Sequence, residues 1–320
     1  MDLEHSLSQA IDFLYQNQLP SGEFRTYLSL DKQMQHNVGS DSCNFVTGVF
    51  LYSTRFVEHP KIAEMMDKAR YFLIEEMEGA GFWRYWTRAS SKMIAQDLDD
   101  TSLISFTLQD HDPLIRSGHN KKKIIDNRNP NGLFYTWIKV DNMQNDVDSV
   151  INANVLLYLG DIPETKAASD YLNTLVLTAS ETSSYWYYLN DMALYYAMSR
   201  AYFHGVESLK PSTGIMLDKV LSFRQKDGAL GDELTTALGI CTSLNLGLGD
   251  VALLKTMVES LLHRQQPGGY WARIPFYTGP EPPIPHSAWF GSEELTTSIC
   301  VEALTRFQKY SDPNITFDQK

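Results

Sequence analysis

Two kinds of helical segment alternate along this chain. Segments of the first kind carry one apolar stripe and one charged face, whereas segments of the second kind are apolar nearly all round. A helix that is apolar on every side has to be covered on every side, so the second kind predicts inner helices and the first kind outer helices. The predicted outer helices are residues 7–16, 63–75, 167–177, 215–224 and 254–264. The predicted inner helices are residues 44–56, 99–109, 149–159, 191–203, 233–244 and 293–307.

Turns that contain glycine and an aromatic residue join several of these pairs, as in Gly79-Ala80-Gly81-Phe82-Trp83 and Pro267-Gly268-Gly269-Tyr270-Trp271. An open array of repeats would need a polar terminal cap, and the last inner segment is too apolar to be one. The pattern therefore favours an all-α fold, a single α/α (α6-α6) barrel of inner and outer helices that spans residues 1–320 as one domain around a central cavity. An open helical solenoid is the alternative. No stretch alternates long enough to predict a sheet, although short strands would fit near the glycine turns.

Composition excludes several classes of function. The net charge of −12 argues against nucleic-acid binding and against docking on an anionic membrane. The basic run Lys121-Lys122-Lys123 lies in a polar stretch and is expected to be a solvated loop. No apolar run approaches the ~18 residues of a membrane span, which leaves at most a transient membrane contact.

The expected compartment is the cytoplasm. Three scattered cysteines, Cys43, Cys241 and Cys300, fit a reducing compartment and predict no disulfide framework. The first residues lack the basic patch and the apolar stretch of a signal peptide.

Three carboxylates, Asp97, Asp99 and Asp100, stand directly ahead of the apolar run 103–108. Burial keeps a carboxylic acid neutral, and neighbouring acids in a dry site share protons and titrate together. The first turn of a helix stabilises the carboxylate that remains after proton loss. The cluster thus suits a strong proton donor for a weak base such as an alkene. Helix capping by aspartate is the plain alternative for a single member of the cluster.

The turns and the acidic cluster together resemble a known family. The segments Gln225-Lys226-Asp227-Gly228 and Gln265-Gln266-Pro267-Gly268-Gly269-Tyr270-Trp271 are similar to the Gln-Trp repeats of squalene and terpene cyclases. The segment Asp97-Leu98-Asp99-Asp100-Thr101 resembles the Asp-x-Asp-Asp signature of class II terpene cyclases. Since the chain fits one barrel, it resembles the small single-domain members, which cyclise a geranylgeranyl chain attached to a dihydroxybenzoate.

This resemblance implies an isomerase that cyclises a linear polyprenyl substrate to a polycyclic meroterpenoid, with Asp99 as the general acid and Asp97 and Asp100 as its partners. It implies no metal and no cofactor, and the Asp-Asp-x-x-Asp motif of class I synthases is not found. In larger cyclases a residue of the next inner helix hydrogen-bonds the acid, which points to Asn152 or Asn154. Two residues that are two positions apart do not share a helix face, so at most one of them is expected to reach Asp99.

Aromatic faces stabilise the cations that migrate along such a substrate. Aromatic residues gather just ahead of the predicted inner helices, with Trp86, Tyr185 and Trp289 as the leading candidates for the cavity wall, although each alone is also a normal core residue. The full set of expected substrate-binding residues is Trp83, Trp86, Tyr185, Trp186, Trp271 and Trp289.

Three other functions stay open at this point. An aromatic cavity equally suits a non-catalytic isoprenoid-binding protein, which has no use for the acid cluster. Asp41-Ser42-Cys43, completed by His111 or His119, would suit a zinc-dependent prenyltransferase subunit. A carbohydrate-active α/α barrel would need two carboxyl groups ~5–10 Å apart across a cleft.

Overall fold

The computed structural model describes residues 2–36, 38–138, 144–279 and 286–311. Most of these residues are helical. The outer helices are α1 (Leu3–Asn17), α3 (Pro60–Glu76), α5 (Pro113–Arg116), α6 (Lys121–Asp126), α8 (Lys166–Thr178), α10 (Lys210–Ser222) and α12 (Val251–His263). The inner helices are α2 (Asn44–Thr54), α4 (Leu98–Leu108), α7 (Ser149–Leu159), α9 (Asp191–Phe203), α11 (Glu233–Asn245) and α13 (Glu293–Ser311). Short 3₁₀ turns are η1 (Pro163–Thr165), η2 (Glu181–Ser183) and η3 (Glu207–Leu209).

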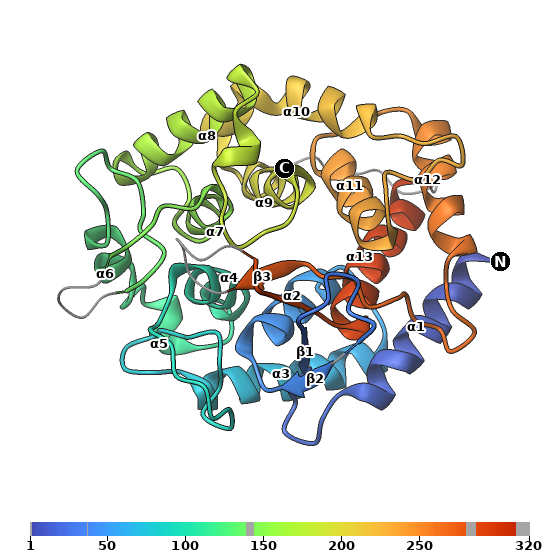
Figure 1. The fold of residues 1–320 in the computed structure, drawn as a ribbon, viewed down its shortest axis with the longest axis horizontal. Helices are drawn as coiled ribbons and strands as arrows, with labels where there is room; N and C mark the ends of the chain where they lie inside the picture. The colour runs from blue at the N-terminus through green and yellow to red at the C-terminus, as the bar shows by residue number, and fades with distance from the viewer. Residues whose placement is uncertain (1, 37, 139–143, 280–285, 312–320) are drawn as a thin grey trace.

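The inner helices form a closed ring. Each one packs against the next along the chain, and α13 returns to pack against α2 (Figure 1). The outer helices lie around the rim, so that α3 covers α2, α8 covers α7 and α12 covers α11 and α13. This order agrees with the alternation of the two sequence patterns.

Burial explains why the two kinds of helix differ in composition. All residues of α2 and of α7 are buried, because each helix has neighbours in the ring and a cover outside. In the outer helix α3, five of 17 residues are buried, and they form one stripe. The mainly helical fold is thus the one that the sequence predicts.

In every described inner helix except α9, a side chain in the first turns fastens a preceding turn to the ring. Its oxygen accepts a hydrogen bond from a backbone N–H of that turn, at 2.9–3.2 Å in each case. The bond satisfies a buried donor that no helix or strand partner reaches. The acceptors are Thr47 of α2, Thr101 of α4, Asn152 of α7, Thr236 of α11 and Thr297 of α13.

A small antiparallel sheet corrects the all-α prediction. Its strands are β1 (Thr26–Ser29), β2 (Gly39–Asp41), β3 (Tyr277–Gly279) and β4 (Ala288–Gly291), in the order β2-β1-β4-β3. The sheet joins the two ends of the chain, with Leu28 opposite Phe290. These strands are too short to show an alternating pattern. The proline-rich segment 280–285 lies outside the described residues, and β3 and β4 stand on either side of it.

The outer layer between α4 and α7 also differs from expectation. The basic run Lys121–Lys123 forms the first turn of α6 and is not a loop. Of the helices in the described ranges, none is long and apolar enough to cross a membrane.

Candidate active site

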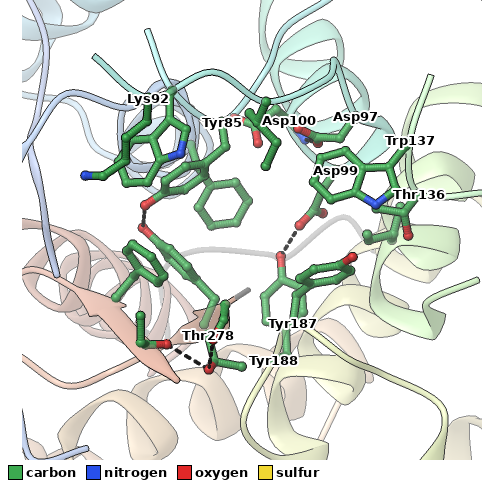
Figure 2. A pocket seen from close by; sticks show the side chains of 18 of the residues that line it. Tyr85, Lys92, Asp97, Asp99, Asp100, Thr136, Trp137, Tyr187, Tyr188 and Thr278 are labelled. Atoms are coloured by element: carbon green, nitrogen blue, oxygen red, sulfur yellow. Dashed lines mark hydrogen bonds between the residues drawn. The ribbon is translucent and has the colours of Figure 1, made fainter. Parts of the chain in front are cut away.

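A cavity of about 500 Å³ opens between the sheet and the first turns of the inner helices. It is within the usual size range of small-molecule sites. Its floor comes from the N-terminal ends of α2, α4 and α7, and β3 and β4 form part of its wall. Aromatic side chains are the largest group in the lining, and the acidic cluster stands at one side of it (Figure 2). The aromatic lining residues are Phe45, Tyr85, Trp86, Trp137, Tyr187, Tyr188, Tyr277 and Phe290.

Asp99 presents its carboxyl group to this cavity. Every other residue of α4 is buried, whereas Asp99 keeps partial exposure because its side chain faces the open space. One carboxyl oxygen, Oδ1, accepts a hydrogen bond of 2.6 Å from Nδ2 of Asn154. The other, Oδ2, accepts one of 2.6 Å from the hydroxyl of Tyr188, as Figure 2 shows. Both oxygens are therefore held from the protein side.

Asp97 and Asp100 flank Asp99 and are more deeply buried, at 4% and 2% exposure. Oδ1 of Asp97 caps α4 by accepting the backbone N–H of Asp100 at 2.8 Å. Oδ2 of Asp97 and Oδ1 of Asp100 are buried without a hydrogen-bond partner among the described residues. Unpaired buried carboxyl oxygens favour the neutral acid.

The pKa values follow from these surroundings. Burial and the neighbouring Asp99 raise the pKa of Asp97 to about 8. Burial, together with Asp97 and Asp99, also raises the pKa of Asp100 well above its ordinary value. Burial raises the pKa of Asp99 too, but hydrogen bonds from Tyr188 and Asn154 oppose the rise. Asp99 is thus the member whose ionised form the protein supports best.

The two asparagines of α7 have separate tasks. Asn154 reaches Asp99, as expected for one of the pair. The amide of Asn152 instead bonds both the N–H and the carbonyl oxygen of Phe134, at 2.9 and 3.0 Å, and the carbonyl oxygen of Asp148. Asn152 therefore fastens the turn before α7, as Thr101 does before α4, and of the two alternatives Asn154 is the one that contacts the acid.

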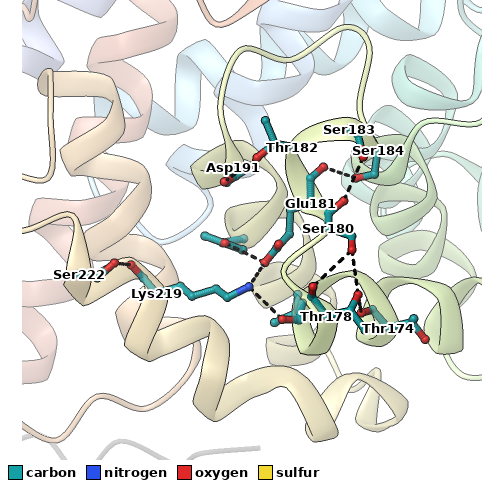
Figure 3. Close-up of polar contacts among 12 residues, drawn as sticks. Thr174, Thr178, Ser180, Glu181, Thr182, Ser183, Ser184, Asp191, Lys219 and Ser222 are labelled. Atoms are coloured by element: carbon teal, nitrogen blue, oxygen red, sulfur yellow. Dashed lines mark hydrogen bonds and ion pairs between the residues drawn. The ribbon is translucent and has the colours of Figure 1, made fainter.

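Tyr188 stands on a segment that several buried polar groups hold in place. The carboxylate of Asp148 caps α7 and also accepts the N–H groups of Trp186 and Tyr187, at 2.7 and 3.3 Å. Upstream, the buried carboxylate of Glu181 pairs with Lys219 of α10, which anchors the turn that leads to Tyr188 (Figure 3). The contact of Tyr188 with Asp99 was not predicted, because the position of Tyr188 depends on these distant partners.

Of the expected aromatic residues, Trp86 lines the cavity and the others lie elsewhere. Tyr185 turns away to donate to Asp191 at 2.8 Å. Trp186 is half exposed at 49%, and Trp289 lies in strand β4 outside the lining.

Trp83 and Trp271 are core residues, both with 0% exposure. Their indole N–H groups donate to the carbonyl oxygens of Leu73 in α3 and Leu261 in α12, at 2.7 and 2.8 Å. The same contact in two repeats shows that these tryptophans tie an outer helix to the turn beside it. Both tryptophans thus belong to the core and not to the cavity wall, where the sequence analysis expected them.

One charged residue near the acid was also missed by the sequence prediction. Arg200 of α9 is 4% exposed and donates from Nη2 to Oδ1 of Asn154 at 2.8 Å. An arginine within a helix that is otherwise apolar all round is a usable signal, because arginine is almost never fully buried without a partner.

The Asp41–Cys43 segment has a structural explanation. Asp41 pairs with Lys92, and Cys43 is buried at the N-terminus of α2, where burial raises the pKa of its thiol. Across the described ranges, no group of three or more His, Cys, Asp or Glu side chains is placed to hold a metal ion.

Solved structures share this fold at low sequence identity. A protein from Actinoplanes has a TM-score of 0.76 and 15% identity, covering 96% of this chain and 100% of that one. A variant of the type II terpene cyclase MstE from Scytonema, in complex with geranylgeranyl dihydroxybenzoate, has a TM-score of 0.71 and 17% identity, covering 95% and 97%. The ent-copalyl diphosphate synthase from Streptomyces platensis has a TM-score of 0.61 and 16% identity, covering 83% of this chain and 50% of that one. The chain thus has a class II terpene cyclase-like fold.

The same fold also occurs with other chemistry. An α-amylase from Clostridium perfringens has a TM-score of 0.61 and 12% identity, covering 94% of this chain and 97% of that one. No protein-family model and no curated protein matches the sequence. The function therefore has to be argued from the site.

Proposed function

We propose that this chain is a class II terpene cyclase in which Asp99 protonates the terminal alkene of a linear polyprenyl substrate. The observation that carries the proposal is a carboxyl group that faces an aromatic cavity of about 500 Å³ and is hydrogen-bonded on both oxygens from the protein side. An amylase-like reaction would instead need a second carboxyl group across the cleft. The three acids that line this cavity all come from one helix start.

The proposed reaction is an isomerisation. The proton of Asp99 moves to the terminal alkene carbon, and the tertiary cation that results is attacked by the π-electrons of the next alkene, which closes a ring. Repetition forms the polycycle, and loss of one proton restores neutrality. The atoms of substrate and product balance, so the reaction consumes no second substrate.

The protein assists at both ends of the charge separation. The carboxylate left on Asp99 keeps its hydrogen bonds from Asn154 and Tyr188 and lies at the N-terminus of α4, whose dipole favours negative charge. The cation meets ring faces such as those of Trp86, Tyr277 and Phe290. Rings stabilise the charge without trapping it.

We propose a geranylgeranylated dihydroxybenzoate as the substrate, by analogy with the bound substrate of MstE. Within the described lining, Lys92 is the cationic residue, and its ammonium group lies 4.2 Å from the ring centre of Trp86. A benzoate head beside Lys92 would place the polyprenyl chain in the aromatic part of the cavity.

We further propose that the helical ring is an α6-α6 barrel and that residues 1–320 form one cyclase domain.

The test is incubation of the purified protein with geranylgeranyl dihydroxybenzoate, followed by chromatography and mass spectrometry. The expected result is a product of unchanged mass with fewer alkenes, formed without added metal. Recovery of unchanged substrate that nevertheless binds would favour an isoprenoid-binding protein. Parallel incubations with geranylgeranyl diphosphate and with squalene test the head group. Conversion of either in preference to the benzoate would overturn the substrate proposal.

A further inference from the structure

Side chains of three neighbouring inner helices form a series of hydrogen bonds that ends at the acid. Arg200 of α9 donates to Oδ1 of Asn154 at 2.8 Å, and Nδ2 of Asn154 donates to Asp99 at 2.6 Å. These contacts link α9, α7 and α4 below the cavity floor. Arg200 itself does not line the cavity that Asp99 faces.

The arginine determines which way the amide points. A guanidinium group has donors and no acceptor, so the atom of Asn154 that faces it has to be the amide oxygen. The NH₂ group is then turned toward Asp99. With the amide reversed, an oxygen would face the carboxyl oxygen of Asp99 and an NH₂ group would face a guanidinium donor. Arg200 therefore fixes the hydrogen bond that reaches the acid.

The direction of that hydrogen bond indicates which oxygen of Asp99 carries the proton that is transferred. Oδ1 of Asp99 accepts from Asn154, which suits the carbonyl oxygen of the neutral acid. The acidic proton then belongs on Oδ2, the oxygen beside the Tyr188 hydroxyl. When Asp99 loses this proton, both of its oxygens still have a donor.

The charge of Arg200 is buried and lacks a direct ion-pair partner in the described part of the chain. Its guanidinium carbon lies 4.7 and 4.4 Å from the ring centres of Tyr52 and Tyr196. The nearby carboxylate Glu302 accepts from Tyr196 at 2.6 Å and from Arg306 at 3.1 Å. The direct hydrogen bond of Arg200 goes to Asn154 and, through it, toward Asp99.

We infer that Arg200 is a positioning residue of the cyclisation, which orients Asn154 and supplies the positive charge that stabilises the Asp99 carboxylate after proton transfer. This inference rests on the proposed function. Besides Asp99, the titratable groups that interact with the charge of Arg200 are Tyr52 of α2, Tyr188 before α9, Tyr196 of α9, His204 just after α9, and Glu302 of α13.

The test compares Arg200→Gln, which removes the charge, with Arg200→Lys, which keeps it. The matched control is the double variant Arg273→Gln/Glu293→Gln, which removes a hydrogen-bonded arginine and carboxylate without touching Arg200 or Asn154. Circular dichroism and thermal melting check that each variant folds. The kinetic readouts are kcat, KM and the pH at which kcat falls on the alkaline side.

Arg200→Gln should lower kcat by about 10²-fold and leave KM within about threefold, because the lost interaction acts in the transition state. The alkaline limb of its pH profile, where kcat falls as the pH rises, should move to higher pH. Asp99 without a nearby cation holds its proton more tightly. Arg200→Lys should restore part of kcat and keep the limb near that of the parent. The control should keep both kcat and the limb.

Two results would overturn the inference. The first is an Arg200→Gln enzyme with kcat within threefold of the parent. The second is a loss of kcat that leaves the alkaline limb in place and that also occurs in the control variant. If Arg200→Gln does not fold, Arg200→Lys decides, because a limb shift despite the retained charge contradicts the account. An inactive parent enzyme would refute the proposed function. An active parent with an inactive Asp99→Asn variant and an indifferent Arg200→Gln variant would refute this inference alone.

Discussion

Helices α4 and α11 begin in the same way and differ where the chemistry is proposed. Each has an N-cap aspartate that accepts a backbone N–H three residues on, at 2.8 Å for Asp97 and 2.7 Å for Asp232. Each also has a threonine that fastens the preceding turn, Thr101 or Thr236, with both bonds at 3.1 Å.

The position two residues beyond the cap separates the two helices. It holds Asp99 in α4 and Leu234, which is 2% exposed, in α11. The corresponding residues are also buried and apolar in α2 and α7, namely Phe45 and Val150. Asp99 is therefore a polar residue at a position that builds the core in α2, α7 and α11. The capping and fastening contacts belong to the fold, and Asp99 belongs to the site.

The largest expected effect comes from Asp99→Asn. The variant keeps the shape of the side chain but has no acidic proton, so kcat should fall by about 10³-fold or more. The thermal midpoint should be unchanged or higher, because the change removes an ionisable group whose charged form burial disfavours.

The matched control for that variant is Leu234→Asn, at the equivalent position of α11. It should lose about 1–3 kcal/mol of unfolding free energy, since it buries an unpaired amide, and should keep kcat. A parental rate in Asp99→Asn, or an equal loss of kcat in both variants, would contradict the separation of site from fold.

The second effect distinguishes the two asparagines of α7. Asn154→Ala removes a donor to the acid, so kcat should fall by about 10²-fold. Asn152→Ala frees the backbone groups of Phe134, so it should cost about 1–3 kcal/mol of unfolding free energy with little change in kcat. Steady-state kinetics and denaturant unfolding measure the two quantities, and the reverse pattern would show that Asn152 serves the acid.

A smaller effect tests whether the fastening threonines are equivalent. Thr101→Val and Thr236→Val each leave one buried N–H unpaired, so each should cost about 1–3 kcal/mol of unfolding free energy. Denaturant unfolding should give the two variants similar losses. A loss confined to Thr101→Val would mean that the fastening contact depends on the acidic cluster and is not a common feature of the ring.

The last prediction concerns how stability depends on pH. The pKa of Asp97 rises from an ordinary value of 3.8 to about 8 in the folded protein. Its stabilising contribution is therefore complete below about pH 4 and is lost as the pH rises toward 8. The unfolding free energy should fall from pH 5 to pH 9, and Asp97→Asn should make that fall shallower. An equal fall in both proteins would show that Asp97 ionises normally.

The sequence predicts the ring well because its signal is local. Segments that are apolar on all sides mark α7 and α9 to the residue, with no knowledge of their partners. The sheet could not be predicted, since Tyr27 pairs with Gly291 across almost the whole chain and neither strand exceeds four residues.

The acid and its partners are unequally predictable. Asp99 follows from a motif, whereas the contact of Tyr188 with Asp99 and that of Arg200 with Asn154 join segments that are distant in the sequence. The sequence does contain a signal that separates Asn152 from Asn154. Asn152 stands at the same distance from its helix start as the fastening residues Thr47, Thr101 and Thr236.

Turnover in D₂O tests the central claim most directly. The proton that Asp99 gives to the alkene is replaced from solvent after each cycle, so the cyclic product should carry one deuterium at the former terminal alkene, located by NMR and mass spectrometry. Unreacted substrate should remain unlabelled. A cyclic product without deuterium at that carbon would contradict protonation by Asp99 as the initiating step.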